Sequence, residues 1–250
     1  MNRALLPKPL GLLVPVVILF LWQGLSSRGA LEPSMIPSPG TVLAAATRAL
    51  RTGELARHVE ISLIRVARGF LAASAAGIPA GLALGWIPSL RALLGPLLHF
   101  LRQIPPVAWI PLFIAWFGIG EGSKISVVAY AAFFPVLLNT EAAAALVSES
   151  YLELGEVYRF SRREVLTRII VPGSLGPMFT GLRLALSNSW RALVAAEMLA
   201  SASGLGYMIV LSRELVRPDV MFLGIAVMGL LGYAMDAAAV RLQKAVAPWT

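Results

Sequence analysis

Long stretches without a charged side chain constrain this chain more than any other feature. One such stretch runs from Gly69 to Ile87, and further apolar runs recur on both sides of it. A helix of ~20 apolar residues crosses the hydrocarbon layer of a bilayer, because it satisfies its own backbone hydrogen bonds there. Hydrophobic residues make up 58% of the chain and charged residues only 14%, far from the composition of a soluble domain. The sequence therefore predicts an all-α, polytopic membrane protein.

The apolar runs predict about six transmembrane helices. A chain of 250 residues has room for these spans and one sizeable loop, but not for a soluble catalytic domain beside them. Arg3 and Lys8 precede the first run and no convincing cleavage site follows it, so we expect an uncleaved first span with its amino terminus inside. This span and its outer loop form residues 1–37, and residues 38–250 form the main membrane domain. The expected spans are 10–24, 69–87, 93–117, 125–146, 176–199 and 220–240.

A charged segment between the fourth and fifth spans, residues 150–172, interrupts this pattern. Its Ser161 and Glu164 have the spacing of a capping box, in which each side chain bonds the backbone N–H of the other residue. A helix is therefore expected to begin at Arg162, with an apolar side that needs a partner. Pro172 is expected to end that helix, because proline lacks the N–H and its ring clashes with the preceding turn. A polar loop with this much local order predicts a contact surface outside the membrane.

The same segment resembles the cytoplasmic signature loop of ATP-binding-cassette importer permeases. That loop places Glu, Gly, Ile and Pro at fixed spacing, and this chain keeps Glu153, Ile169 and Pro172 at the matching positions. Arg159 stands where Gly is expected, so a left-handed backbone at that point would carry a steric cost. In two further departures from the pattern, Leu154 and Gly155 replace two Ala, and Val171 replaces Leu. Phrases elsewhere in the chain strengthen the match: IPPVAWIP from Ile104, FFPVLLNT from Phe133, GLRLAL from Gly181, LVAAEM from Leu193 and SGLGYM from Ser203.

The resemblance covers the chain from about residue 37 onward and is strongest to the permeases of aliphatic sulfonate, taurine, nitrate and bicarbonate importers. It implies a bacterial inner-membrane homodimer with a cytoplasmic ATPase dimer and an external solute-binding protein, both termini and the signature loop being cytoplasmic. The solute is expected to be small and anionic, and a neutral or aromatic vitamin or pyrimidine precursor is the alternative. ATP hydrolysis in partner subunits would drive alternating access, so this chain is expected to be no enzyme and to need no cofactor. The resemblance places these residues at the ATPase: Glu153, Gly155, Arg159, Ser161, Arg162, Arg163 and Glu164.

The fifth span carries a stripe of polar and aromatic residues. At 100° per residue, Arg183, Ser187, Trp190, Val194 and Glu197 share one side of the helix, with Arg191 beside them. Ionisable groups at this depth normally face protein or water, and a cation would suit an anionic solute. The stripe therefore indicates a translocation pathway; alternatively, Arg183 reaches the inner surface and Arg191 pairs with an acidic neighbour. The candidate pathway residues are Asn139, Arg183, Ser187, Trp190, Arg191 and Glu197.

Two earlier helices carry patterns of their own. From Glu54 onward, charged side chains fall within one arc of a helix, which indicates either a solvated face or a docking surface for the solute-binding protein. Arg65 and Arg68 are expected to extend to the membrane boundary. Prolines in the third span predict a kink that either lines a pathway or only packs in the bundle. The charged arc consists of Glu54, Arg57, His58, Arg65 and Arg68; a glycine ridge for close helix packing consists of Gly77, Gly81 and Gly85; and the prolines are Pro105, Pro106 and Pro111.

Other functions find little support in the residues. The chain has no Cys and two His, which argues against disulfides, metal sites and a membrane-embedded enzyme. The turn GIGEGSK from Gly118 fails as a phosphate-binding loop, because Ser123 and Ile125 replace the Gly and the Ser or Thr that such a loop needs. The net charge of +8 lies at helix ends and in loops, where anionic lipid rather than nucleic acid is the expected partner. A passive channel, the other alternative, would not need an organised cytoplasmic loop.

Overall fold

The computed structural model describes residues 10–147 and 149–246, and all regular structure in these ranges is helical. The long helices are α3, α6, α9 and α11, and shorter helices join or flank them. The elements in chain order are α1 Leu10–Ser27, α2 Pro39–Arg51, α3 Glu54–Trp86, α4 Pro88–Leu101, the 3-10 segment η1 Pro106–Trp109, α5 Ile110–Phe117, α6 Glu121–Ala145, α7 Glu149–Val157, α8 Arg162–Val165, the π-helical segment η2 Leu166–Ile170, α9 Val171–Ala200, α10 Leu205–Glu214 and α11 Pro218–Val246.

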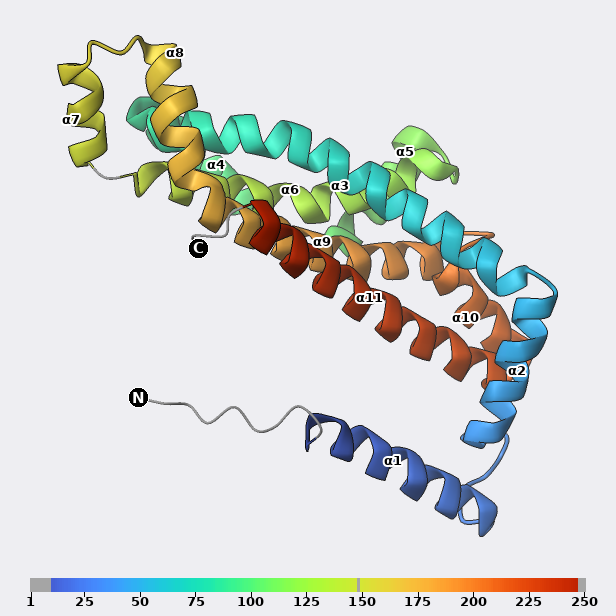
Figure 1. Cartoon of the computed structure of the whole chain (residues 1–250). Coiled ribbons are helices and arrows are strands. Elements are labelled where there is room, and N and C mark those ends of the chain that lie inside the picture. The colour runs from blue at the N-terminus through green and yellow to red at the C-terminus, as the bar shows by residue number, and fades with distance from the viewer. Residues whose placement is uncertain (1–9, 148, 247–250) are drawn as a thin grey trace.

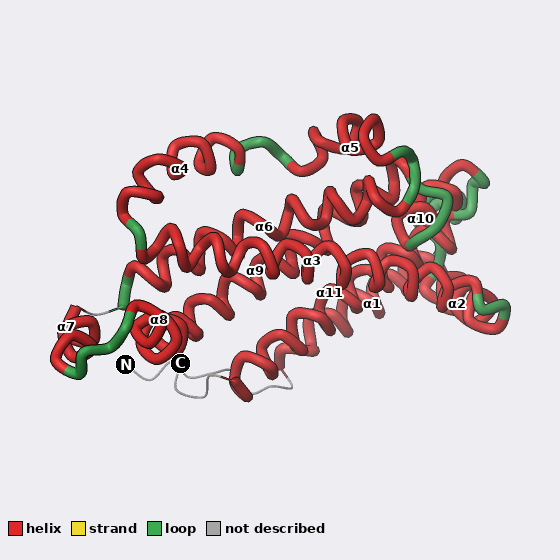
Figure 2. The backbone as a smooth tube through the Cα atoms, turned by 90° about the horizontal axis from the view of Figure 1, so that it is seen from above, coloured by secondary structure: helices red, strands yellow, loops and turns green. Residues whose placement is uncertain are grey.

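The core of the molecule is a bundle in which α3 and α9 both pack along α6. Helix α11 lies beside α9, and α2 and α10 close one end of the bundle (Figure 1). Helices α7 and α8 project from the opposite end, near the end of α11. Helix α4, η1 and α5 follow one another along one side of α6 (Figure 2). The fold therefore separates two polar ends by the length of its long helices.

The glycine ridge of α3 is the reason that α3 and α6 approach closely. A Cβ atom added at Gly81 would lie 2.5 Å from the carbonyl oxygen of Leu137, and one at Gly85 would lie 2.5 Å from that of Glu141. Gly77 faces Val136 in the same way, at 3.0 Å from its side chain. Only a residue without a Cβ fits at these contacts, because helix backbones meet there. The predicted packing ridge is confirmed.

The prediction of six spans is not confirmed by the described residues. Among them, four segments are long and apolar enough to cross a membrane: Glu54–Trp86, Glu121–Ala145, Arg162–Ala200 and Pro218–Val246. The expected third span is instead a broken pair, Pro88–Leu101 and Pro106–Phe117, bent by 85°. Counting the pair as one span gives five, and the apolar part of α1, Leu13–Ser27, is shorter.

Prolines explain the break in the third span. Pro105 and Pro106 have no backbone N–H to give to the preceding turn, so α4 ends at Leu101 and a 3-10 segment follows. The turn expected at 88–91 lies instead at Ile87, the single residue between Trp86, where α3 ends, and Pro88, where α4 begins. Proline is favourable in the first turn of a helix, where its missing N–H has no partner in any case.

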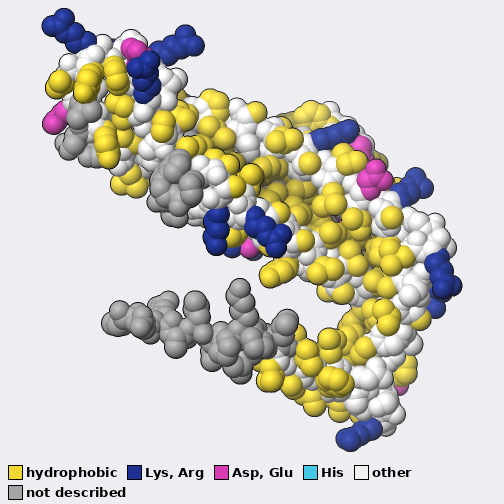
Figure 3. All heavy atoms as spheres, viewed as in Figure 1, with side chains coloured by type: hydrophobic (Ala, Val, Ile, Leu, Met, Phe, Trp, Pro, Cys, Tyr) yellow, Lys and Arg dark blue, Asp and Glu magenta, His cyan; other side chains and the backbone are white. Residues whose placement is uncertain are grey.

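The surface of the molecule has polar ends and an apolar middle. Hydrophobic side chains cover much of the long helices, and Lys, Arg, Asp and Glu gather mainly toward the two ends, with a further charged group near the end of α11 (Figure 3). Apolar side chains such as Phe20, Leu71 and Leu230 are more than half exposed on the helices. An exposed apolar belt between polar ends is the surface that a bilayer covers.

Candidate coupling loop and solute pathway

Helices α7 and α8 form a hairpin that stands away from the bundle at one end (Figure 1). Gly155 is the point where α7 meets the following helix: a Cβ there would lie 3.0 Å from Ile169 Cδ1 and 3.5 Å from Val165 Cγ2. The apolar side of the 162–170 helix thus finds its partner within the loop itself. Gly155 is buried, and it is a packing position between the two helices of the loop.

The turn between α7 and α8 runs through a left-handed residue that is not glycine. Arg159 has a φ of 53°. Its N–H donates to the carbonyl of Glu156 at 2.9 Å, and the N–H of Phe160 donates to that of Gly155 at 2.8 Å. These two bonds form the Schellman ending of a helix, which glycine normally makes without strain. The backbone therefore keeps the expected turn, and Arg159 carries the steric cost.

The predicted capping box at the start of α8 is confirmed. The Glu164 carboxylate accepts from the N–H of Ser161 at 3.0 Å, and the Ser161 hydroxyl accepts from the N–H of Glu164 at 3.4 Å. Arg168 lies 3.5 Å from Glu164 and covers the Phe160 ring at 5.4 Å from its centroid. Local contacts thus hold the hairpin in one shape, and the exposed pair at 164 and 168 adds little energy by itself.

The expectation that Pro172 ends the helix is wrong. The helix continues from Arg162 to Ala200, and Pro172 lies in the first turn of α9. Directly before it, η2 has π-helical hydrogen bonding, with the N–H of Val171 donating to Leu166. The wider π turn shifts the hydrogen-bond register ahead of a residue that has no N–H, so the helix passes through the proline. The hairpin is consequently continuous with a membrane-spanning helix.

The outer surface of the hairpin is open for a partner. Tyr151, Val157 and Tyr158 are 63%, 81% and 66% exposed. Apolar side chains of this size on a polar projection mark a contact surface. Among the residues expected at the ATPase, Glu153, Arg159, Ser161, Arg162 and Arg163 are exposed, Glu164 is half-buried, and Gly155 is buried.

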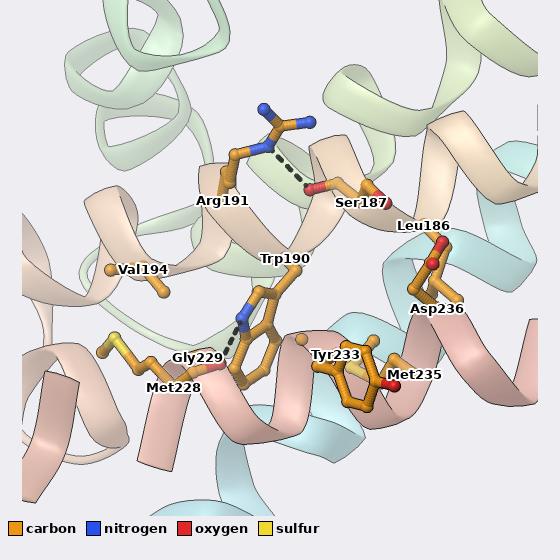
Figure 4. A pocket seen from close by; sticks show the side chains of 11 residues that line it. Leu186, Ser187, Trp190, Arg191, Val194, Met228, Gly229, Tyr233, Met235 and Asp236 are labelled. Atoms are coloured by element: carbon orange, nitrogen blue, oxygen red, sulfur yellow. Dashed lines mark hydrogen bonds between the residues drawn. The ribbon is translucent and has the colours of Figure 1, made fainter. Parts of the chain in front are cut away.

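The predicted pathway residues of α9 do not share one environment. Arg183 donates to both carboxylate oxygens of Asp236 of α11, through Nε and Nη2, with Nη2 2.7 Å from Oδ2. Trp190 is buried and donates through Nε1 to the carbonyl of Met228 at 3.2 Å. Ser187 and Trp190 line a groove of about 500 Å³ between α9 and α11 (Figure 4).

Arg191 lines the same groove from α9. Its Nε donates to the carbonyl of Ser187 at 3.1 Å (Figure 4). Its Nη2 donates to Asn188 Oδ1 at 3.1 Å. The alternative in which Arg191 pairs with an acidic neighbour is wrong, since no carboxylate of a described residue lies within 4.0 Å of it. Asn139 lines a second groove, between α6, α9 and the broken pair.

Glu197 is sealed inside the other end of the bundle. It accepts from Arg65 Nη1 at 2.8 Å, from the Ser62 hydroxyl at 2.9 Å and from the N–H of Gly206 at 2.9 Å. Arg65 also donates to Glu121 through Nε at 2.7 Å. The expectation that Arg65 extends to the membrane boundary is therefore wrong, because its side chain is only 1% exposed.

This buried cluster joins three helices and a loop. Arg65 comes from α3, Glu121 from the start of α6 and Glu197 from the end of α9. Arg65 Nη1 also donates to the carbonyl of Ser203 at 2.8 Å, and His58 accepts from the N–H of Gly204 at 3.0 Å. A buried charge needs such a set of partners. Sequence reasoning missed the roles of Ser62 and Glu121, because a glutamate in the first turn of a helix is common for the helix dipole alone.

Long apolar helices, a broken span beside polar grooves and a stiff polar hairpin together define a membrane transport permease. The chain belongs to the family of binding-protein-dependent transport system inner membrane components, whose model matches residues 75–249. The resemblance to importer permeases is thereby confirmed.

Relatives cover nearly the whole chain. An aliphatic sulfonates transport permease protein of Bacillus subtilis, SsuC, is 35% identical over 96% of this chain and 87% of its own length. The taurine transport system permease protein TauC of Escherichia coli is 34% identical, with 93% and 86% covered. The bicarbonate transport system permease protein CmpB of Synechococcus elongatus is 31% identical, with 94% and 89% covered.

A solved structure has the same fold. A chain of the MetNI methionine transporter in an inward-facing conformation matches with a TM-score of 0.69 at 18% identity, covering 77% of this chain and 95% of that one. Family membership makes this chain a multi-pass inner-membrane permease subunit and not an enzyme in its own right. Importers of this family work in general with ATPase subunits and a solute-binding protein.

Proposed function

We propose that the chain forms, as a homodimer, the membrane pathway of an importer for a small anionic solute of the sulfonate, taurine, nitrate or bicarbonate type. Relatives whose names specify aliphatic sulfonates, taurine and bicarbonate support an anion as the common chemistry. The two arginines Arg102 and Arg191, which pair with no carboxylate among the described residues, support it independently. Residues 38–250 would form the permease domain, with residues 1–37 adding a first span.

The α7–α8 hairpin is the proposed seat of the ATPase. The observation that carries this assignment is its exposed, locally fixed shape at one end of the bundle, continuous with α9. Closure of the ATPase subunits on ATP would move the hairpin as a rigid lever, and α9 would carry that motion into the membrane domain. In this orientation the hairpin end and both termini are cytoplasmic. The end formed by α2 and α10 would then face the solute-binding protein.

Charge reversal in the hairpin tests the coupling. Glu153→Arg and Arg162→Glu change exposed side chains, so the permease should fold and bind its ATPase subunits. Uptake should fall at least ten-fold in proteoliposomes containing the whole importer, and ATPase stimulation by the loaded binding protein should be lost. Arg28→Glu, a reversal in the linker after α1, is the matched control.

Normal uptake together with normal ATPase stimulation in both hairpin variants would contradict the coupling role. Co-purification with the ATPase subunits separates a coupling defect from a failure of assembly. The class of solute is tested apart from these variants, by comparing uptake of ethanesulfonate, bicarbonate and a neutral pyrimidine by the unmodified importer. Uptake of the pyrimidine alone would overturn the anionic assignment and leave the coupling proposal intact.

A further inference from the structure

The groove between α6, α9 and the broken α4–α5 pair is lined by one cation and two amides, and by no carboxylate of a described residue. Its volume is about 430 Å³, and Arg102, Tyr130, Asn139 and Asn188 are its polar lining residues. Arg191, which lines the neighbouring groove between α9 and α11, adjoins this one through its bond to Asn188. The acidic residues on the helices around it are engaged elsewhere: Glu121 and Glu197 with Arg65, Glu141 with Arg91, and Asp236 with Arg183.

The polar donors of this groove have spare capacity. The Arg102 side chain makes no hydrogen bond or ion pair with any described residue, while its backbone N–H belongs to the end of α4. Asn188 accepts from Arg191, and no bond of its own N–H groups appears within the described ranges. Arg191 keeps free N–H groups after donating to Ser187 and Asn188, because a guanidinium has five. Unused donors around one cavity are what an oxyanion needs.

The groove lies far from both ends of the long helices. Asn188 is roughly 27 Å along α9, whose full length is roughly 45 Å at 1.5 Å per residue. Tyr130 is roughly 15 Å from the start of α6, and its hydroxyl donates to the carbonyl of Leu101 at 2.6 Å. That bond holds the break in the third span, with Arg102 on it, at the same depth. Two arginines at such depth are stable only beside protein or water, which favours a wet groove.

We propose that Arg102, Asn188 and Arg191 form an oxyanion-binding site at mid-membrane, where the sulfonate or related head group of the solute rests during transit. The break at Pro105 and Pro106 places Arg102 beside α9, and Tyr130 and Phe134 give an aromatic wall for the organic part of the solute. Asn139 supplies a further amide at the edge toward α6. This inference rests on the proposed import of an anion, and it adds the residues that would hold the charge.

Chemical labelling tests the site without depending on transport. The chain has no Cys, so Asn188→Cys places a single thiol in the groove. In the complete importer in nanodiscs, an anionic methanethiosulfonate reagent should label this thiol several-fold faster than a cationic one, because the arginines attract anions. Ethanesulfonate should slow the labelling, and dimethyl sulfone, a neutral compound with a similar sulfur centre, should not.

Removing one arginine completes the test. In the Asn188→Cys variant, a second substitution, Arg102→Gln, should reduce the labelling preference for the anionic reagent several-fold. Arg28→Gln, in an exposed linker far along the chain, should leave that preference unchanged. Asn188→Asp, nearly identical in shape, should reduce ethanesulfonate uptake at least ten-fold by repulsion, with assembly retained. Two results would overturn the site. One is a thiol that stays unreactive both in the presence and in the absence of ATP, and the other is a labelling preference that does not depend on Arg102.

The two proposals fail in different ways. If the unmodified importer takes up ethanesulfonate and the labelling preference is absent, only the mid-membrane site is wrong. If the unmodified importer takes up only neutral solutes, the anionic function is wrong whatever the labelling gives.

Discussion

Arg65 and Glu197 meet inside the bundle although they are 132 residues apart in the chain. Arg65 Nη1 lies 2.8 Å from Glu197 Oε1, and the two side chains are 1% and 0% exposed. A buried ion pair of this kind stabilises a fold mainly because either charge alone would be left without a partner. The pair fixes α3 against the end of α9 and, through Glu121, against the start of α6.

We expect Arg65→Ala to destabilise the permease by about 3–5 kcal/mol, because Glu197 would remain buried without its cation. Arg68→Ala, an exposed arginine one turn further along α3, is the control and should change stability by less than about 0.5 kcal/mol. Glu197→Gln should cost less than Arg65→Ala, since an amide can still bond Ser62 and Gly206 while Arg65 keeps Glu121. Thermal unfolding of the purified permease measures all three, and equal losses for Arg65→Ala and Arg68→Ala would contradict the role of the pair.

The glycine ridge gives a second prediction. Gly85→Ala should destabilise the bundle by about 1–3 kcal/mol, because the new Cβ would lie 2.5 Å from the Glu141 carbonyl and 2.6 Å from Ala144 Cβ. Gly95→Ala in α4 meets nothing within 4 Å, so it should be neutral or should stabilise by about 0.5–1 kcal/mol. Unfolding midpoints of the two variants should therefore move in opposite directions or differ clearly. If Gly95→Ala lost stability and Gly85→Ala did not, the close contact of Gly85 with α6 would not be what restricts this position to glycine.

The strain at Arg159 gives a third prediction. Arg159→Gly should stabilise the hairpin by about 1–2 kcal/mol, because glycine adopts the left-handed conformation without a Cβ clash. Hydrogen exchange of the Phe160 amide, which donates to Gly155 at 2.8 Å, should slow accordingly. Arg159→Ala removes the same side chain but keeps a Cβ, so it should give no such protection. Equal protection in both variants would place the effect in the side chain rather than in the backbone.

The capping box gives a fourth prediction. Ser161→Ala removes the acceptor for the Glu164 N–H and should destabilise the start of α8 by about 1 kcal/mol. Exchange of the Glu164 amide should rise several-fold, and fewer solutes should be taken up per ATP hydrolysed. Ser161→Thr keeps a hydroxyl, so it should preserve both the exchange rate of the Glu164 amide and the number of solutes taken up per ATP. A coupling ratio unchanged in Ser161→Ala would mean that the ATPase holds the hairpin without help from the cap.

Local patterns in the sequence predicted the parts of the fold that depend on neighbours in the chain. Ser161 and Glu164 are three positions apart, so their capping box could be foreseen from spacing alone, and the signature loop identified the family from the same short segment. Prediction failed at Pro172, where the rule that a proline ends a helix did not hold. Pro172 does not end its helix, because the π segment directly before it shifts the hydrogen-bond register ahead of a residue that has no N–H.

Charges on the helices were predicted less well. Arg65 was placed on a solvated face because its helical position agrees with Arg57 and Arg68, both of which are exposed. Its actual partners, Glu121 and Glu197, come from helices that only the folded chain brings together. Likewise, a wheel drawn for α9 alone placed Arg183 beside Arg191. In the folded chain, Arg183 pairs with Asp236 of α11, whereas Arg191 bonds Asn188 within α9.

The sequence alone therefore determined the class of protein, the positions of its long helices and the capped hairpin, since hydropathy and hydrogen bonding between near neighbours decide these locally. Only the tertiary structure decided the break angle of the third span, the partner of each buried charge and the groove in which Arg102 and Asn188 meet. Those features depend on distances between residues far apart in the chain, and such distances are set by how whole helices pack.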